Sequence, residues 1–368
     1  MNGRLRRLKM RLPSSKPARG SWSVCSTVAE PAEMLYAFVA HYLEAGAQEV
    51  HLFIDDPEQL GLETLSALKG VRLTICDAVY WKDRTGNRPK GQVMRQLKNA
   101  NFAYETCSTD WFFFCDADEF FVSDIPVSQL LKVVPAEVVH CRTAMAERAF
   151  RAGQRQKSLF DGVLRLPLKK GQAALREVYG DLTPMTTRGL LGHVAGKSFV
   201  RAGRFDQRIR IHFPVPMDAT EETRLRAAGE LNAGPELAGG WLAHFDGMTQ
   251  LHWRLKLLRY YLSYAPQLKT GDTKVFDRRT PARSRQLNAV YEGRGNPAVL
   301  DRLTPLICLD ERMLDRLRRA GGLLDMAVDP AQAARRMVSP DLTFCAADFD
   351  EALRGRHSNL IARYGLEG

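Results

Sequence analysis

The chain is 368 residues long, with 45% apolar and 26% charged residues, a composition that predicts a globular protein with a sizeable core and excludes a largely disordered chain. Its 53 lysines and arginines outnumber 42 aspartates and glutamates for a net charge of +11, but seven of these basic residues and no acidic residue fall within residues 1–20. The remaining chain carries only about +4, which excludes the strongly basic body typical of many nucleic-acid-binding domains.

Residues 1–20 form a predicted basic flexible tail. Leu5, Leu8 and Leu12 recur at helical spacing among the basic residues, so the tail could lie on an anionic membrane surface as a peripheral contact. The alternative is a solvated arm without a partner. Because no apolar run has the length of a membrane span, and seven scattered cysteines form no CxxC pair, we expect a cytoplasmic protein with reduced thiols.

Strand and helix patterns alternate from residue 21 onward. Short apolar runs predict strands, and apolar residues at three- and four-residue spacing predict the helices between them. The expected strands are 21–30, 49–56, 71–78, 111–115 and 136–142, and the expected helices are 31–46, 57–69 and 92–107, with a loop over 81–91. This order predicts an open, mostly parallel α/β sheet flanked by helices, with ligands at the carboxyl ends of its strands.

The pattern becomes less regular after residue 143. Segments 188–203 and 208–216 predict strands of a mixed extension, 248–265 predicts an amphipathic helix, and short helices such as 310–322 follow. We therefore divide the chain into the tail, a main domain over 21–265 and a helical C-terminal extension over 266–368.

Two aspartates, Asp116 and Asp118, follow the apolar strand at 111–115. Carboxylates this close repel one another unless a cation lies between them. A hard divalent ion such as Mn²⁺ or Mg²⁺ is the simplest candidate, because it prefers oxygen ligands. The alternative is an acidic loop that caps a following helix.

These motifs together resemble a known family. A strand near Val24, Asp55-Asp56 after the second strand, Arg95-Gln96 and Asn99 on a helix, and the segment DWFFFCDADEFF are similar to family-2-like glycosyltransferases of the GT-A fold, in the bacterial branch whose motif reads DADEF. The resemblance covers roughly residues 21 to 260 and is strongest in 35–56 and 92–121.

The resemblance implies roles for individual residues. Asp116 and Asp118 would hold a Mn²⁺ or Mg²⁺ ion that bridges the two phosphates of a nucleotide-sugar. Asp55 or Asp56 would contact the nucleoside. The other candidates for donor binding are Lys90, Arg95, Asn99 and Lys197, the last in a segment that also carries His193 and Arg201.

The third metal ligand and the catalytic base are less defined. The resemblance implies a downstream histidine as ligand, and His244 follows a glycine-rich turn, with His252 on the next helix as a second possibility. Lys256 and Arg259 on that helix either serve phosphate or face solvent. For the base that deprotonates the acceptor, the carboxylates Glu119, Asp206 and Asp246 all stay open.

The leading hypothesis is a metal-dependent glycosyltransferase that moves a sugar from a nucleotide-sugar donor to a hydroxyl of a glycan or lipid-linked acceptor, in cell-surface glycan synthesis. One alternative is a haloacid-dehalogenase-like phosphatase with Asp116 as nucleophile, although about a hundred residues of α/β pattern precede this aspartate and Glu119 follows the motif. The other is a non-catalytic protein that binds membrane or nucleic acid through its basic tail. We expect no nucleic-acid partner, because no signature of such binding occurs.

Overall fold

The first third of the chain builds a parallel sheet. The structure, a computed structural model, describes residues 20–169, 171–269 and 273–366. The strands pair in parallel in the order β3-β2-β1-β4, which confirms the predicted open α/β sheet. They are β1 (Trp22–Val28), β2 (Glu49–Ile54), β3 (Val71–Ile75) and β4 (Trp111–Phe114), and the intervening helices are α1 (Ala32–Glu44), α2 (Glu63–Ala67), α3 (Ala78–Thr85) and α4 (Gln92–Thr106).

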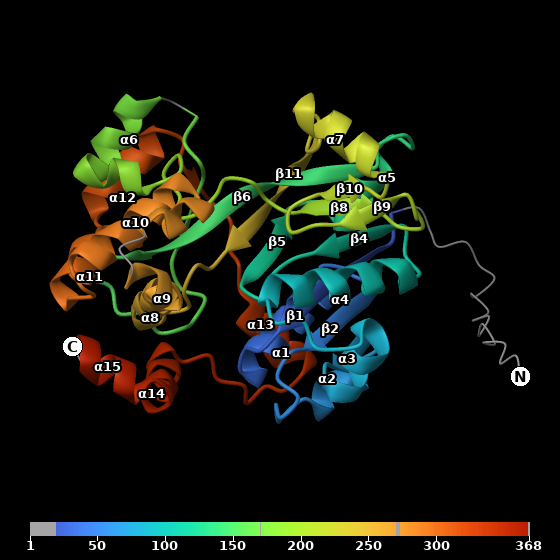
Figure 1. Cartoon of the computed structure of the whole chain (residues 1–368), viewed down its shortest axis with the longest axis horizontal. Helices are drawn as coiled ribbons and strands as arrows, with labels where there is room; N and C mark the ends of the chain where they lie inside the picture. Colours follow the sequence, from blue (N-terminus) through green and yellow to red (C-terminus); the bar gives the residue numbers. More distant parts are fainter. Residues whose placement is uncertain (1–19, 170, 270–272, 367–368) are drawn as a thin grey trace, which may run out of the picture.

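Helices cover both faces of this sheet (Figure 1). In β4, Phe113 packs in the core that contains the buried residues of α1, whereas Phe112 and Phe114 pack in the core that contains those of α4. Successive side chains of a strand point to opposite faces. The continuous apolar run in β4 is therefore explained by a strand that is buried on both sides.

The sheet continues beyond β4 as the mixed extension that the sequence predicts. Strand β8 pairs antiparallel with β4 and β6, and β7 pairs antiparallel with β6, while β11 lies between β5 (antiparallel) and β6 (parallel). Two short strands from the end of the chain, β12 and β13, join β6 and β7. The bounds are β5 (Glu119–Ser123), β6 (His140–Arg151), β7 (Val163–Arg165), β8 (Ser198–Arg201), β11 (Glu236–His244), β12 (Cys308–Leu309), β13 (Leu323–Leu324), and a separate hairpin of β9 (Gln207–Ile209) and β10 (Pro214–Pro216).

The C-terminal region is helical, as predicted. Its α13 returns to pack against α1 (Figure 1), with buried alanines in the same core as the α1 residues. Thus residues beyond 265 contribute to the sheet and to the first core as well as to helices of their own. The remaining helices are α5 (Val127–Lys132), α6 (Gln172–Tyr179), α7 (Ala219–Ala227), α8 (Gln250–Ser263), α9 (Ala265–Leu268), α10 (Pro281–Glu292), α11 (Pro297–Leu303), α12 (Glu311–Arg319), α13 (Pro330–Met337), α14 (Ala346–Arg356) and α15 (Ser358–Tyr364), with 3₁₀ turns η1 (Gly180–Met185), η2 (Thr273–Arg278) and η3 (Thr304–Leu306).

Several predicted bounds were wrong. The strand expected at 136–142 runs from 140 to 151, and only Ser198–Arg201 of segment 188–203 is a strand. Residues 81–85 of the predicted loop over 81–91 belong to α3. Asp77 caps this helix by accepting a hydrogen bond from the Tyr80 N–H, and the Trp81 side chain is buried. Residues 1–19 of the predicted basic tail (1–20) lie outside the described residues. Among the helices that the structure describes, we find none with the length and apolar character to span a membrane.

Candidate functional site

The two aspartates lie in a tight turn between β4 and β5. The Asp116 N–H donates to Glu119 Oε2 at 2.8 Å, and the Glu119 N–H donates to the Asp116 carbonyl at 3.1 Å. The Phe245 N–H donates to the Asp118 carbonyl at 2.9 Å, which ties the turn to the end of β11. The residue after Asp118 begins β5, so the alternative in which this acidic loop caps a helix is wrong. The turn instead holds both side chains at the carboxyl edge of the parallel strands.

Asp116 is held by two side chains from different elements. Lys197 Nζ lies 2.8 Å from its Oδ2, and Gln96 Nε2 on α4 donates to its Oδ1 at 3.0 Å. The Lys197 side chain is only 1% exposed, and its Nζ also lies 3.4 Å from Glu119 Oε2. Burial by itself raises the pKa of Asp116, but the charge and hydrogen bond of Lys197, together with the His244 charge, lower this pKa overall. Lys197 is therefore the counter-ion that keeps Asp116 ionised.

Glu119 lies behind Asp116 rather than at the surface. It is 2% exposed, and burial, with the Asp116 charge as a smaller contribution, raises its pKa to about 7 even though Lys197 lowers it. Its carboxylate accepts the Asp116 N–H and lies beside Lys197. This position favours a role in orienting the turn and Lys197 over the role of catalytic base, which needs direct contact with a substrate.

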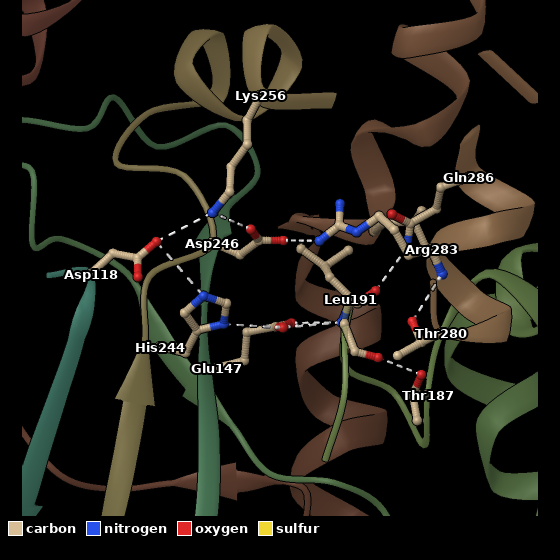
Figure 2. A network of polar contacts seen from close by, with 12 residues as sticks. Asp118, Glu147, Thr187, Leu191, His244, Asp246, Lys256, Thr280, Arg283 and Gln286 are labelled. Atoms are coloured by element: carbon tan, nitrogen blue, oxygen red, sulfur yellow. Dashed lines mark hydrogen bonds and ion pairs between the residues drawn. The ribbon is translucent and has the colours of Figure 1, made fainter. Parts of the chain in front are cut away.

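Asp118 faces a second set of cations, shown in Figure 2. Lys256 Nζ on α8 lies 3.2 Å from Asp118 Oδ2, and His244 Nε2 at the end of β11 lies 3.7 Å from the same oxygen. Burial and the neighbouring carboxylates act in opposite directions on the pKa of His244: burial lowers it, and Asp118 and Asp246 raise it to about 9. The predicted pair of Asp118 and His244 is thus brought together.

Asp246 continues this network. It is 2% exposed, with Lys256 Nζ 2.7 Å from Oδ1 and an Arg283 nitrogen 2.5 Å from Oδ2. Burial raises its pKa, but Arg283 and Lys256 outweigh burial and hold the pKa well below its ordinary value. A carboxylate that two cations keep ionised is a weak proton acceptor. The geometry therefore favours Asp246 as a counter-ion over Asp246 as the base.

The sequence did not single out two further carboxylates at this site. Glu147 on β6 lies 4.0 Å from His244 Nδ1 through Oε2 and pairs with the buried Arg165 at 2.5 Å. Half-buried Glu30 follows β1 at the same sheet edge, and burial, then Asp118 and Asp116, raise its pKa to about 7. The position of Glu30 just after a parallel strand is a signal that could have identified it. No comparable signal exists for Glu147, which lies in an ordinary-looking strand.

The nucleoside end of the predicted site has its own geometry. Arg95 Nε lies 2.8 Å from Asp55 Oδ1, and Arg88 also pairs with this carboxylate at 3.0 Å. Asp56 and Lys90 are exposed. Beside them is a pocket of about 410 Å³ at the ends of β2 and β3, lined by residues that include Pro57, Cys76, Asp77, Trp81 and Arg88. Asp55 and Arg95 are thus brought together at the edge of the sheet that carries Asp116.

Two other candidates have their polar groups bonded within the protein. Asn99 is fully buried, where it donates to Thr27 Oγ1 at 3.0 Å and accepts from Tyr80 at 2.7 Å, so it has no surface to offer a donor. Arg201 donates to the carbonyls of Val134, Pro135 and Val138. It therefore connects β8 to the segment that precedes β6.

Asp206, His193 and His252 have direct contacts outside the pairs of Asp116 and Asp118. Asp206 pairs with Arg204 at 2.8 Å and lines a different pocket, of about 550 Å³. His193 lies edge-on to His212, and His252 Nδ1 accepts from the Met248 N–H at 3.1 Å. Asp206 therefore has no contact that places it beside Asp116 or Asp118.

The two carboxylates predicted to hold a metal ion have lysine partners in the structure. The described residues contain no group of three or more histidine, cysteine, aspartate or glutamate side chains that could hold a metal ion. Asp116 and Asp118 each have a lysine ammonium as partner, at 2.8 and 3.2 Å. These residues, as they stand, do not fit a preformed metal centre.

Comparison with known proteins gives only remote similarity. No protein-family model matches the chain, and no curated protein matches it either. Similar solved structures include TarS 1–349 of S. aureus (13% identity, 49% of this chain and 47% of that chain, TM-score 0.25), HddC from Yersinia pseudotuberculosis (10%, 49% and 74%, 0.25) and a mycobacterial protein (11%, 61% and 65%, 0.29). The match spans about half of the TarS chain. Similarities this weak assign no function, which has to be argued from the site.

Proposed function

We propose that the chain is a glycosyltransferase that transfers a sugar from a nucleotide-sugar donor to a hydroxyl acceptor. The observation that supports this most directly is the arrangement along one sheet edge, where the Asp116–Asp118 turn follows β4 and the pocket beside Asp55 follows β2 and β3. In open α/β sheets, ligands bind at the carboxyl ends of the strands. A diphosphate near the turn and a nucleoside in the pocket would match both features.

The roles within the proposed reaction follow from the contacts. Lys256 has two N–H donors directed at Asp118 and Asp246, and an ammonium carries three, so one remains for a phosphate oxygen. His244 is the other cationic group beside Asp118. Lys197 and Gln96 fix the orientation of Asp116. We assign no base, because Glu119 and Asp246 are enclosed by their own partners.

The finer parts of the sequence hypothesis belong to this proposal as well. They are a glycan or lipid-linked acceptor, a role in cell-surface glycan synthesis, a cytoplasmic location and a membrane contact through residues 1–20. The predicted Mn²⁺ or Mg²⁺ stays a prediction, and no step above depends on it. If the basic tail were the functional part, removal of residues 1–20 would abolish partner binding, whereas a transferase should retain donor binding.

The proposal is tested by a thermal-shift screen of nucleoside diphosphates and nucleotide-sugars. A ligand that binds only the folded state raises the melting temperature by mass action. We expect at least one nucleotide to stabilise the native protein, and Asp118→Asn to reduce that shift. Asp124→Asn, an exposed acid after β5, is the matched control and should behave as the native protein. If no nucleotide stabilises the protein with Mn²⁺, with Mg²⁺ or with a chelator, the proposal fails.

A further inference from the structure

The two aspartates of the turn each have a lysine as their nearest cation. Asp116 pairs with Lys197 at 2.8 Å and Asp118 pairs with Lys256 at 3.2 Å. The lysines come from separate elements, the segment before β8 and the middle of α8. Two independent parts of the chain thus deliver one ammonium to each carboxylate.

Lys197 is enclosed, although 37% of the Asp116 side chain that it contacts is exposed. The Lys197 side chain is 1% exposed and lies between Asp116, Glu119 and the Phe114 ring, whose centre is 5.4 Å from Nζ. A buried ammonium without partners is very costly, so Lys197 needs these carboxylates. If Asp116 moved to bind a metal ion, Glu119 would be the remaining carboxylate beside the buried Lys197 ammonium.

Charges across the site are balanced by the protein itself. Asp118 and Asp246 share Lys256, and Asp246 also pairs with Arg283 at 2.5 Å (Figure 2). A divalent cation at Asp116 and Asp118 would sit close to two ammonium groups and be repelled by both. A diphosphate, in contrast, would be attracted to Lys256, whose side chain is 23% exposed.

We propose that Lys256, positioned by Asp118 and Asp246, binds the diphosphate of the donor in place of a divalent metal, so that donor binding requires no Mn²⁺ or Mg²⁺. In this arrangement Asp116 and Asp118 are positioning residues for lysines. Lys197 holds the turn in place through Asp116 and Glu119. Lys256 donates its remaining N–H to a phosphate oxygen. The inference rests on the proposed function, because it concerns the diphosphate of that donor.

The first test uses the native protein and the nucleoside diphosphate that the screen identifies, in Mn²⁺ and in excess EDTA, by calorimetry. We expect dissociation constants that agree within about threefold in the two buffers. Electron paramagnetic resonance of Mn²⁺ should show no saturable binding to the protein alone. Binding that occurs only with Mn²⁺ overturns the inference but leaves the transferase proposal standing, whereas no binding in either buffer overturns both.

The second test removes the ammonium. Lys256→Gln should weaken binding of the diphosphate about tenfold or more, since a charge-assisted hydrogen bond is lost. Arg254→Gln is the control. It removes a cation from the same helix, but Arg254 pairs with Asp301 at 2.7 Å, so this variant should bind the diphosphate as tightly as the native protein does. Equal affinity of Lys256→Gln and Arg254→Gln overturns the inference. If Lys256→Gln does not fold, the comparison of EDTA with Mn²⁺ on the native protein still decides it.

Discussion

Glu147 shows how one buried carboxylate connects several elements. It accepts hydrogen bonds from the Arg165 guanidinium at 3.1 and 2.5 Å and from the Leu191 N–H at 2.9 Å, and it faces His244 (Figure 2). Arg165 is 0% exposed. The pair therefore holds β6, β7 and the segment after η1 together beneath the site.

We expect Glu147→Gln to lower the free energy of unfolding by about 3–5 kcal/mol, because it leaves the charge of Arg165 buried without its counter-ion. Urea denaturation followed by circular dichroism measures this. Glu311→Gln is the control, since Glu311 pairs with Arg151 at the surface with its side chain 73% exposed, and it should change stability by less than about 1 kcal/mol. Similar small effects in both variants would contradict the role given to Glu147.

His41 makes stability depend on pH. Its Nε2 lies 2.8 Å from the Phe121 carbonyl, and burial lowers its pKa to about 4 from the ordinary 6.5. Because the unfolded state takes up a proton first, stability contributed by the neutral imidazole is complete above about pH 6.5 and is lost as the pH falls toward 4. Burial also lowers the pKa of His252 to about 4 and of His212 to about 3. These two histidines therefore contribute, with His41, to the loss of stability at low pH.

His41→Gln keeps a donor for the Phe121 carbonyl. Between pH 7 and pH 4, we expect the free energy of unfolding of this variant to fall by about 1–3 kcal/mol less than that of the native protein. Urea denaturation at a series of pH values gives the two slopes. Parallel slopes for native protein and variant would show that His41 does not carry this dependence.

At the scale of elements, the sequence predicted correctly those strands and turns whose residues carry a clear local pattern. The apolar run of β4 and the turn that follows it placed Asp116 and Asp118 correctly at the strand end, because a strand buried on both faces leaves a clear signal. The length of β6 had no such signal, since its buried Glu147 and Arg148 look like solvent-facing charges. The same holds for α3, whose charged residues suggested a loop.

The ion pairs of the site could not be predicted from spacing. Asp118, Asp246, Lys256 and Arg283 meet although they are separated by up to 165 residues in the printed numbering. Which lysine reaches which aspartate depends on how α8 and α10 pack, and no short motif encodes that. The sequence therefore indicated the carboxylates but not the cations that neutralise them.

Gly196 sets the position of Lys197. A Cβ at this residue would collide with the carbonyl oxygen and Oγ1 of Thr143, and the Lys197 N–H donates to that Oγ1 at 3.0 Å. Gly196→Ala should therefore shift the segment before β8, lower the free energy of unfolding by about 1–3 kcal/mol and weaken nucleotide binding. Gly192→Ala, where an added Cβ meets nothing within 4 Å, should leave both unchanged. Thermal shifts with and without nucleotide report both effects, and equal behaviour of the two variants would refute this role.

For the whole molecule, the end of the chain contributes to the core that supports the site. Helix α13 packs on α1, and Ala334 is 0% exposed in the core shared with that helix. Strands β12 and β13 also pair with β6 and β7. If these contacts matter for stability, the predicted division at residue 265 does not correspond to two units that unfold separately.

We expect Ala334→Asp to lower the free energy of unfolding of the whole protein by about 2–4 kcal/mol, because it buries an unpaired charge between α13 and α1. Arg336→Ala on the same helix removes only a half-exposed pair with Glu44 and should cost less than about 1 kcal/mol. Urea unfolding followed both by tryptophan fluorescence and by loss of nucleotide binding should give one coincident transition in each variant. A transition in Ala334→Asp that leaves nucleotide binding intact at its midpoint would instead show that α13 unfolds separately, and that nucleotide binding does not require its packing on α1.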